Sequence, residues 1–117
     1  MSKFRNKPTL DRAAAMLKAL GHPHRLSIFL RLVDCCGAGR CCGTEAEYAA
    51  CVGDLGADLD IAPSTLSHHV KELRQAGLIR VERNGQRVEC GVDLQAVAEL
   101  RTLLHQFDGV SAVAAKD

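Results

Sequence analysis

The sequence has 117 residues, of which 47% are hydrophobic and only 3% aromatic, and its formal net charge is +1. This length suits one domain, and the absence of any run of about 18 apolar residues excludes a transmembrane helix. The basic N-terminus lacks the apolar stretch of a signal peptide, so a cytoplasmic protein without a membrane partner is expected. With so few aromatics, the core is expected to consist of Leu, Val, Ile and Ala, and a dimer interface would help to bury it.

The charges are unevenly distributed along the chain. Residues 1–31 hold seven Lys or Arg against one acid, residues 34–60 hold six acids against Arg40, and residues 62–90 hold five bases against three acids. A basic face beside an acidic one fits a DNA footprint, but ordinary solvated surfaces have the same pattern. The charge distribution by itself therefore leaves DNA binding open.

Two amphipathic helices are predicted in the N-terminal third. Thr9 can cap a helix over about 10–20 that Gly21 ends, and Pro23 opens a second helix that runs to about Asp34. The residues predicted to share one apolar face of the first helix are Leu10, Ala13, Ala14, Leu17 and Leu20, and those predicted to face inward in the second helix are Leu26, Phe29, Leu30 and Val33.

The middle of the chain predicts a loop followed by a two-helix unit. Residues 35–44 are rich in Gly and Cys and have no period, which indicates a loop. A helical turn is expected at 44–47, a short helix at 52–59 and a turn at 58–62. The clearest helix covers 61–77, where Pro63 opens it and Gly77 closes it. Its predicted inner face consists of Leu66, Val70 and Leu73.

The C-terminal third predicts a β-hairpin and a last helix. Alternating apolar residues on either side of Asn84-Gly85 favour two strands joined by a two-residue turn. Asp93 can cap a helix over about 94–107, and the tail from 108 is expected to be frayed. The apolar residues of this helix are Leu94, Val97, Leu100, Leu104 and Phe107.

This order of elements predicts one winged helix-turn-helix domain over 1–117, with its core at about 10–107. The fold class is mainly α with a β-hairpin wing. The first and last helices have no other evident role than to pair, so they are predicted to form a homodimer.

The second helix of such a unit lies in the major groove with its N-terminal residues at base edges. Lys71 and Arg74 would neutralise phosphates, and Arg83, Asn84, Gln86 and Arg87 fit a wing that lies along the DNA backbone or in the minor groove. Each feature alone also suits a solvated surface, but their combination favours double-stranded DNA as the partner. The residues predicted to contact DNA are Ser64, Thr65, Ser67, His68, His69, Lys71, Arg83 and Arg87.

Six cysteines are many for a cytosolic chain of this length, and five of them lie within 35–51. Soft thiolates select arsenite, antimonite, Cd, Hg, Pb, Cu(I) or Zn. Arsenic(III) requires three sulfurs, whereas structural zinc prefers four ligands. Adjacent cysteines rarely form a disulfide with each other, because their Cα atoms are too close. The predicted metal ligands are Cys35, Cys36, Cys41, Cys42 and Cys51, whereas Cys90 shares a strand face with Val88 and Val92 and is expected in the core.

Two longer motifs and one short one resemble a known family. Residues 17–28, LKALGHPHRLSI, resemble the LKALaHPxRLxIL entry of the ArsR family of metal-responsive repressors. Residues 64–79, STLSHHVKELRQAGLI, are similar to its SxxSxHLxxLrxAGLV recognition helix, and 51–55, CVGDL, resemble its CVCDL box. The resemblance spans about 10–107 and implies a homodimer that binds a palindromic operator and leaves it when an inducer binds.

The sequence departs from this family at its metal sites. Gly53 stands where the box has its second Cys, so only Cys51 matches the family's Cys-x-Cys arsenite or cadmium site. The Asp-x-His and His-x-x-Glu/His set that many zinc-sensing members carry on the last helix is incomplete. His22 and His24 are interpreted as polar residues at a helix entry and not as ligands.

The favoured function is a repressor released from its operator by a soft metal or metalloid, with As(III) favoured and Cd, Pb, Hg or Zn as alternatives. The first alternative is a thiol-redox or reactive-sulfur sensor on the same scaffold. If the cysteines have no sensing role, they form either a loop without a ligand or a structural zinc site. A protein–protein module would show no salt-dependent DNA affinity. An enzyme is not expected, because no third group orients a Cys–His pair and no Gly-rich phosphate loop is apparent.

Overall fold

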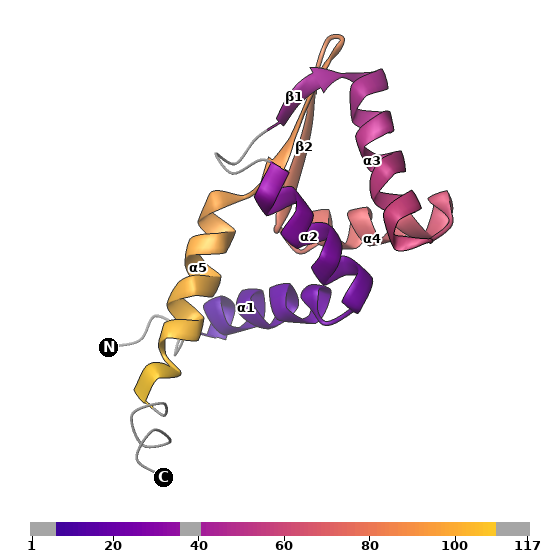
Figure 1. The fold of residues 1–117 in the computed structure, drawn as a ribbon. Helices are drawn as coiled ribbons and strands as arrows, with labels where there is room; N and C mark the ends of the chain where they lie inside the picture. Colours follow the sequence, from indigo (N-terminus) through magenta and orange to yellow (C-terminus); the bar gives the residue numbers. More distant parts are fainter. Residues whose placement is uncertain (1–6, 36–40, 110–117) are drawn as a thin grey trace.

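The computed structural model describes residues 7–35 and 41–109. The helices form a body from which the hairpin β2–β3 projects (Figure 1). This arrangement confirms the predicted winged helix-turn-helix, mainly α with a β wing. The elements in chain order are α1 (Lys7–Leu20), α2 (Pro23–Cys35), β1 (Cys41–Thr44), α3 (Glu45–Leu59), α4 (Pro63–Gln75), β2 (Ile79–Asn84), β3 (Arg87–Val92) and α5 (Leu94–His105).

The third helix is longer than the sequence predicts. The helical turn at 44–47 and the helix at 52–59 form one continuous α3. This helix contains Gly53 and Gly56, although glycine lowers helix stability because it favours the unfolded chain. At Gly56 the small residue has a packing reason, because an added Cβ would lie 3.0 Å from Leu66 Cδ2. Glycine therefore lets α3 approach α4 closely at the centre of the two-helix unit.

The segment predicted as a loop over 35–44 contains a strand. Its last four residues form β1, which pairs antiparallel with β3 and places Cys41 opposite Cys90 and Thr44 opposite Arg87. The sheet order is β1-β3-β2, so the wing has a third strand, which pairs with the half of β3 nearest the turn. The sequence missed β1 because CCGT lacks the alternation of a half-buried strand, and its pairing comes from the outer edge of β3. Residues 36–40, with Cys36, and 110–117 of the predicted tail lie outside the described residues.

The turn of the wing is shifted by one residue from its predicted position. The register pairs Asn84 with Arg87, so Gly85 and Gln86 form the two-residue connection in place of Asn84-Gly85. Gly85 has φ +61°, a conformation that favours glycine at the first central position of such a turn. The hairpin is thus confirmed, with its strands ending one residue later on the first side.

The core faces of α1 and α2 differ from the predicted ones. The side chains buried in these helices include Met16, Ala19, Ile28 and Leu32. Both helices carry apolar residues on more than one face, so a 3.6-residue period does not select the buried one. Ala13 and Phe29 are buried as predicted, but Leu10, Ala14 and Leu17 of the predicted apolar face of α1 and Leu26 and Leu30 of the predicted inner face of α2 are exposed. The residues Leu94, Leu104 and Phe107, which were predicted only to be apolar residues of the last helix, are exposed as well.

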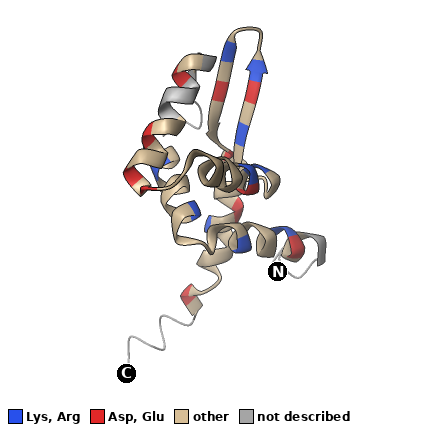
Figure 2. Cartoon of the chain, turned by 90° about the vertical axis from the view of Figure 1, so that its right-hand side faces the viewer, with Lys and Arg blue, Asp and Glu red and all other residues tan. Residues whose placement is uncertain are grey.

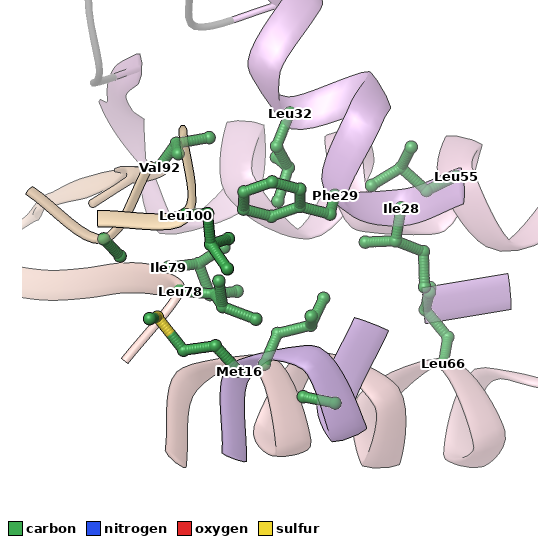
Figure 3. Close-up of a cluster of buried hydrophobic side chains, with 13 residues drawn as sticks. Met16, Ile28, Phe29, Leu32, Leu55, Leu66, Leu78, Ile79, Val92 and Leu100 are labelled. Atoms are coloured by element: carbon green, nitrogen blue, oxygen red, sulfur yellow. The ribbon is translucent and has the colours of Figure 1, made fainter. Parts of the chain in front are cut away.

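The core joins every helix to the base of the wing (Figure 3). Phe29 and Leu32 of α2 lie opposite Leu78 and Ile79 at the start of β2. Asp93 caps α5 as predicted, because its side chain accepts hydrogen bonds from the backbone N–H groups of Gln95 and Ala96. Within the described residues, no helix is both long and apolar enough to cross a bilayer.

Candidate nucleic-acid interface

The two-helix unit is built by a short connection between α3 and α4. Asp60 has φ +55°, and the Ile61 N–H donates to the Gly56 carbonyl at 3.1 Å, so the chain reverses immediately after α3. Pro63 occupies the start of α4, where a missing N–H is not needed. Leu66 and Leu73 then fix the inner face of α4 in the core. The opposite face of α4 is left open to solvent.

The open face of α4 carries most of the residues predicted to contact DNA. Ser64, Thr65, Ser67, His68 and Lys71 are all exposed. Short hydroxyl side chains occupy the first turn, and the cation follows one turn later. This arrangement presents hydrogen-bonding groups at the N-terminal end of the helix, where the helix dipole also favours an anion such as a phosphate.

His69 lies on the other side of α4 and corrects the prediction made for it. Its side chain is only 5% exposed, and its ring lies 4.5 Å from the ring of His22, measured between centroids. In a helix, a residue one position after His68 points about 100° away, so the two histidines cannot share one face. His69 is therefore part of the interior and not of the surface that faces DNA.

The α4 surface and the wing meet at two grooves. Ser67, Lys71, Arg74 and Arg83 line a groove of about 620 Å³ between α3, α4 and the wing, whose floor includes Gly56 and Leu66. Lys71 and Arg74 also line a second groove of about 470 Å³ beside β2, together with Arg80. Basic residues from α4 and β2 thus gather at one junction. Arg87 lies on β3 near the turn, outside the residues that line these grooves.

Acidic residues also occur on the wing, where Glu82 lies on β2 and Glu89 on β3 beside basic residues (Figure 2). On the wing, Arg80 Nη2 and Glu82 Oε1 form an ion pair at 3.0 Å. On the far side of the unit, Asp58 of α3 forms an ion pair with Arg31 of α2. Both interactions hold acids to neighbouring bases and reduce the negative charge that approaching DNA would meet.

A histidine cluster that sequence reasoning did not predict lies behind α4. His22 Nδ1 accepts a hydrogen bond from the His24 backbone N–H at 3.1 Å, which fits the predicted polar helix entry. The pKa of His69 lies below its ordinary value, because burial disfavours the charged ring and because His22, Arg25, His24 and His68 add positive charge nearby. Within the described residues, His69 Nδ1 has no hydrogen-bond partner.

The sequence shows His22-Pro-His24 and His68-His69 as two separate pairs. The packing of α2 against α4 brings His22, His24 and His69 together, so the cluster cannot be read from either segment alone. In the sequence, the one sign of it is the number of histidines near helix starts.

The predicted cysteine ligands are distributed over three elements. Cys35 is the last residue of α2, Cys41 and Cys42 are in β1, and Cys51 is in α3. Cys36 lies outside the described residues. Cys90 is half-buried on β3 and packs against the core, as predicted. The backbone therefore places the ends of the cysteine-rich segment beside the helical body and the wing.

Comparisons with known proteins agree with this architecture. Residues 20–82 match the family model of a helix-turn-helix domain. The chain is 33% identical over 87 residues to the HTH-type transcriptional regulator YgaV of Escherichia coli (strain K12), covering 74% of this chain and 76% of that protein. It is 29% identical over 96 residues to the transcriptional activator HlyU of Vibrio cholerae, covering 82% and 77%.

The fold also matches solved structures. The crystal structure of an ArsR family transcriptional regulator superposes with a TM-score of 0.61 at 19% identity, covering 87% of this chain and 92% of that one. This structural similarity supports the fold. The match to the family model and the identity with the relatives show that the sequences are related as well. The chain therefore belongs to the ArsR family of winged helix-turn-helix transcriptional regulators, whose members bind DNA.

Proposed function

We propose that this protein is a repressor that binds a double-stranded operator as a homodimer and leaves it when a soft metal or metalloid binds its cysteines. The observation that carries the DNA-binding part is the junction of α4 and the wing, where Ser67, Lys71, Arg74 and Arg83 line one groove. On an ordinary solvated surface, cations from two elements have no need to lie together. Contact with a DNA phosphate backbone does require such a gathering of cations.

The proposed contacts divide into two kinds. Ser64, Thr65, Ser67 and His68 lie at the N-terminal end of α4 and would read base edges in the major groove. A second set, made of cations, would contact phosphates and fix the register without selecting a sequence. This set consists of Lys71, Arg74, Arg83 and Arg87.

Repression is the simpler outcome of operator binding. A dimer that covers a promoter excludes polymerase by occupancy alone, whereas activation requires a further contact or the removal of a competing protein. The relative HlyU is named as an activator, so the sign of regulation is an outcome of the test and not an assumption of it.

The proposed inducer site is the set Cys35, Cys36, Cys41, Cys42 and Cys51. Its members come from the end of α2, from β1 and from α3, with Cys36 between the first two. Because β1 pairs with β3, an ion bound by these thiolates would connect the helical body to a strand of the wing. As(III) is favoured because three of the five thiols suffice for it, and Cd, Pb, Hg and Zn are the alternatives.

The dimer interface is proposed to lie on α1 and α5. Leu10 and Leu17 on α1, Leu94 and Leu104 on α5, and Phe107 just after α5 are between 44% and 60% exposed. A soluble chain rarely exposes so many large apolar residues on two adjacent helices without covering them. A second copy of the chain, arranged about a two-fold axis, would bury them.

The test begins with selection of bound duplexes from a random DNA library, followed by titration of the selected duplex at several salt concentrations. We expect tight binding with a steep salt dependence, and release after addition of arsenite or cadmium. Loss of binding after peroxide or persulfide treatment, with no effect of the metals, would instead support the thiol-redox alternative. Salt-independent or absent DNA binding would contradict the proposed function.

A further inference from the structure

Three imidazole rings from two helices meet on the inner side of α4. His22 directly precedes α2, His24 lies in its first turn, and His69 is near the middle of α4. One ring nitrogen from each residue lies within 4.8 Å of the others. The ring centroids of His24 and His69 are 5.9 Å apart, and those of His22 and His24 are 5.3 Å apart.

This spacing is close to that of a metal site. A tetrahedral zinc ion with bonds of about 2.0–2.1 Å holds its nitrogen ligands roughly 3.4 Å apart. Side-chain rotations that move each ring nitrogen by about 1 Å would bring the histidine nitrogens into this range. His22 and His24 are half-buried at the entry of α2, so an ion can arrive from solvent and a water molecule can complete its coordination.

The buried ring of His69 supplies a second observation. It is 5% exposed, and its Nδ1 atom has no hydrogen-bond partner within the described part of the chain. Buried polar atoms are nearly always paired, so an exception calls for an unmodelled partner or a functional reason. A bound cation would satisfy this nitrogen.

We propose that His22, His24 and His69 bind one transition-metal ion of the Zn²⁺ type, at a site separate from the cysteine cluster. The three donors are all imidazole nitrogens. Such a set suits Zn, Co or Ni, whereas Mg and Ca require oxygen ligands. The proposal reverses the interpretation of His22 and His24 as helix-entry residues without ligand function.

The charge near the cluster determines the expected affinity. Burial lowers the pKa of His69, and charge on His22, Arg25, His24 and His68 would further disfavour a charged His69 ring. The guanidinium of Arg25 opposes a dication for the same electrostatic reason, so moderate affinity is expected.

Metal binding must change the first turn of α2. His22 Nδ1 accepts a hydrogen bond from the His24 backbone N–H at 3.1 Å. If the metal binds Nε2, the neutral ring carries its proton on Nδ1 and can no longer accept this bond. If the metal binds Nδ1, it replaces the N–H directly. The His24 amide is therefore a spectroscopic reporter of the proposed site.

The experiment is a Zn²⁺ titration of the full chain with the five clustered cysteines replaced by serine, followed by mass spectrometry and amide NMR. We expect one Zn²⁺ per chain and a shift of the His24 amide resonance. His24→Gln should lower the affinity by more than about tenfold, since loss of a supporting residue alone costs about 10- to 100-fold. The matched control is His105→Gln, because His105 is exposed on α5 and pairs with Asp108 at 2.7 Å, away from the three histidines.

The proposal is overturned if the folded five-serine protein binds no stoichiometric Zn²⁺, or if His24→Gln binds as well as its parent. It is also overturned if His105→Gln weakens binding as much as His24→Gln does. If the five-serine protein does not fold, Co²⁺ binding to the unsubstituted chain gives the same comparison, because thiolate and imidazole sites have different cobalt absorption spectra. The test involves no DNA, so its result is independent of the proposed operator binding.

Discussion

Arg12 of α1 and Glu99 of α5 form an ion pair with 2.9 Å between Nε and Oε2. The pair joins the first helix of the chain to the last, and the Glu99 side chain is only 14% exposed. Since both helices also carry exposed apolar residues, this contact holds together the two halves of the proposed dimer surface.

The first prediction concerns that surface. Leu104→Glu should raise the dissociation constant of the dimer by more than about tenfold, which corresponds to about 1.4 kcal/mol, because it places a charge in an apolar interface. Sedimentation equilibrium measures this change. Leu30→Glu is the control, since Leu30 is 54% exposed on α2 and Leu104 is 53% exposed on α5. An unsubstituted chain that is monomeric at micromolar concentration would contradict the proposed dimer.

The second prediction separates the roles of the wing and of α4. Arg87→Ala should weaken binding to all duplexes alike and lower the slope of log K against log salt by about one unit, as the loss of one phosphate contact does. Ser67→Ala or His68→Ala should instead change the sequence preference. Anisotropy titrations on the selected duplex and on single-base variants distinguish the two effects. Identical behaviour of the wing and helix variants would show that the proposed division of roles is wrong.

The third prediction uses two glycines of α3. Gly53→Ala should stabilise the protein by about 0.5–1 kcal/mol, because alanine favours a helix and nothing lies within 4 Å of the added Cβ. Gly56→Ala should destabilise it by about 1 kcal/mol, because the added Cβ would meet the buried Leu66 side chain at 3.0 Å. Urea denaturation gives both values. Equal effects of the two substitutions would argue against the close approach of α3 and α4.

The fourth prediction is a pH dependence of stability with chelator present. The pKa of His69 is lowered from 6.5 in the folded protein, so near this pH the unfolded chain binds more protons than the folded one. Stability should therefore be complete above about pH 6.5 and fall as the pH drops below it, by at most about 1.4 kcal/mol per pH unit for this one group. His69→Leu should flatten the profile between pH 7 and pH 5. A wild-type slope that His69→Leu does not reduce would exclude this cause.

The fifth prediction concerns the proposed inducer site. Serine substitution of Cys35, Cys36, Cys41, Cys42 or Cys51, singly and together, should raise the arsenite concentration needed for operator release. Thiolates are the ligating form, so arsenite or cadmium binding should release protons and weaken at low pH. A coupling of about 1–3 kcal/mol would correspond to roughly 5- to 150-fold release. If all five substitutions together leave induction intact, the cluster is not the sensor.

The sequence predicted the elements whose signals are local. Pro63, the Asn84-Gly85 pair and Asp93 mark helix and turn boundaries through their own backbone or side-chain chemistry, and each lies at or within one residue of its predicted boundary. The same holds for the exposed polar residues of α4. Where one residue type determines the local conformation, the boundary of the element can be predicted without knowledge of the tertiary contacts.

Features that depend on contacts between distant segments were not predicted. Strand β1 exists because β3 offers it an edge, and the buried face of α1 is decided by which of its apolar stripes meets α2 and α5. The histidine cluster has the same origin, since His69 faces inward only because Leu66 and Leu73 fix the rotation of α4. Nothing in a single segment carries this information.

Among the residues that the structure describes, the sheet order β1-β3-β2 leaves β2 with one unpaired edge. Open edges are the sites at which sheets of different molecules join and aggregate. On β2, Arg80, Glu82 and Arg83 are exposed, and the ion pair between Arg80 and Glu82 lies along this strand. A second strand that docked here would have to desolvate these charges. These charged side chains therefore protect the open edge of β2 from aggregation with a strand of another molecule.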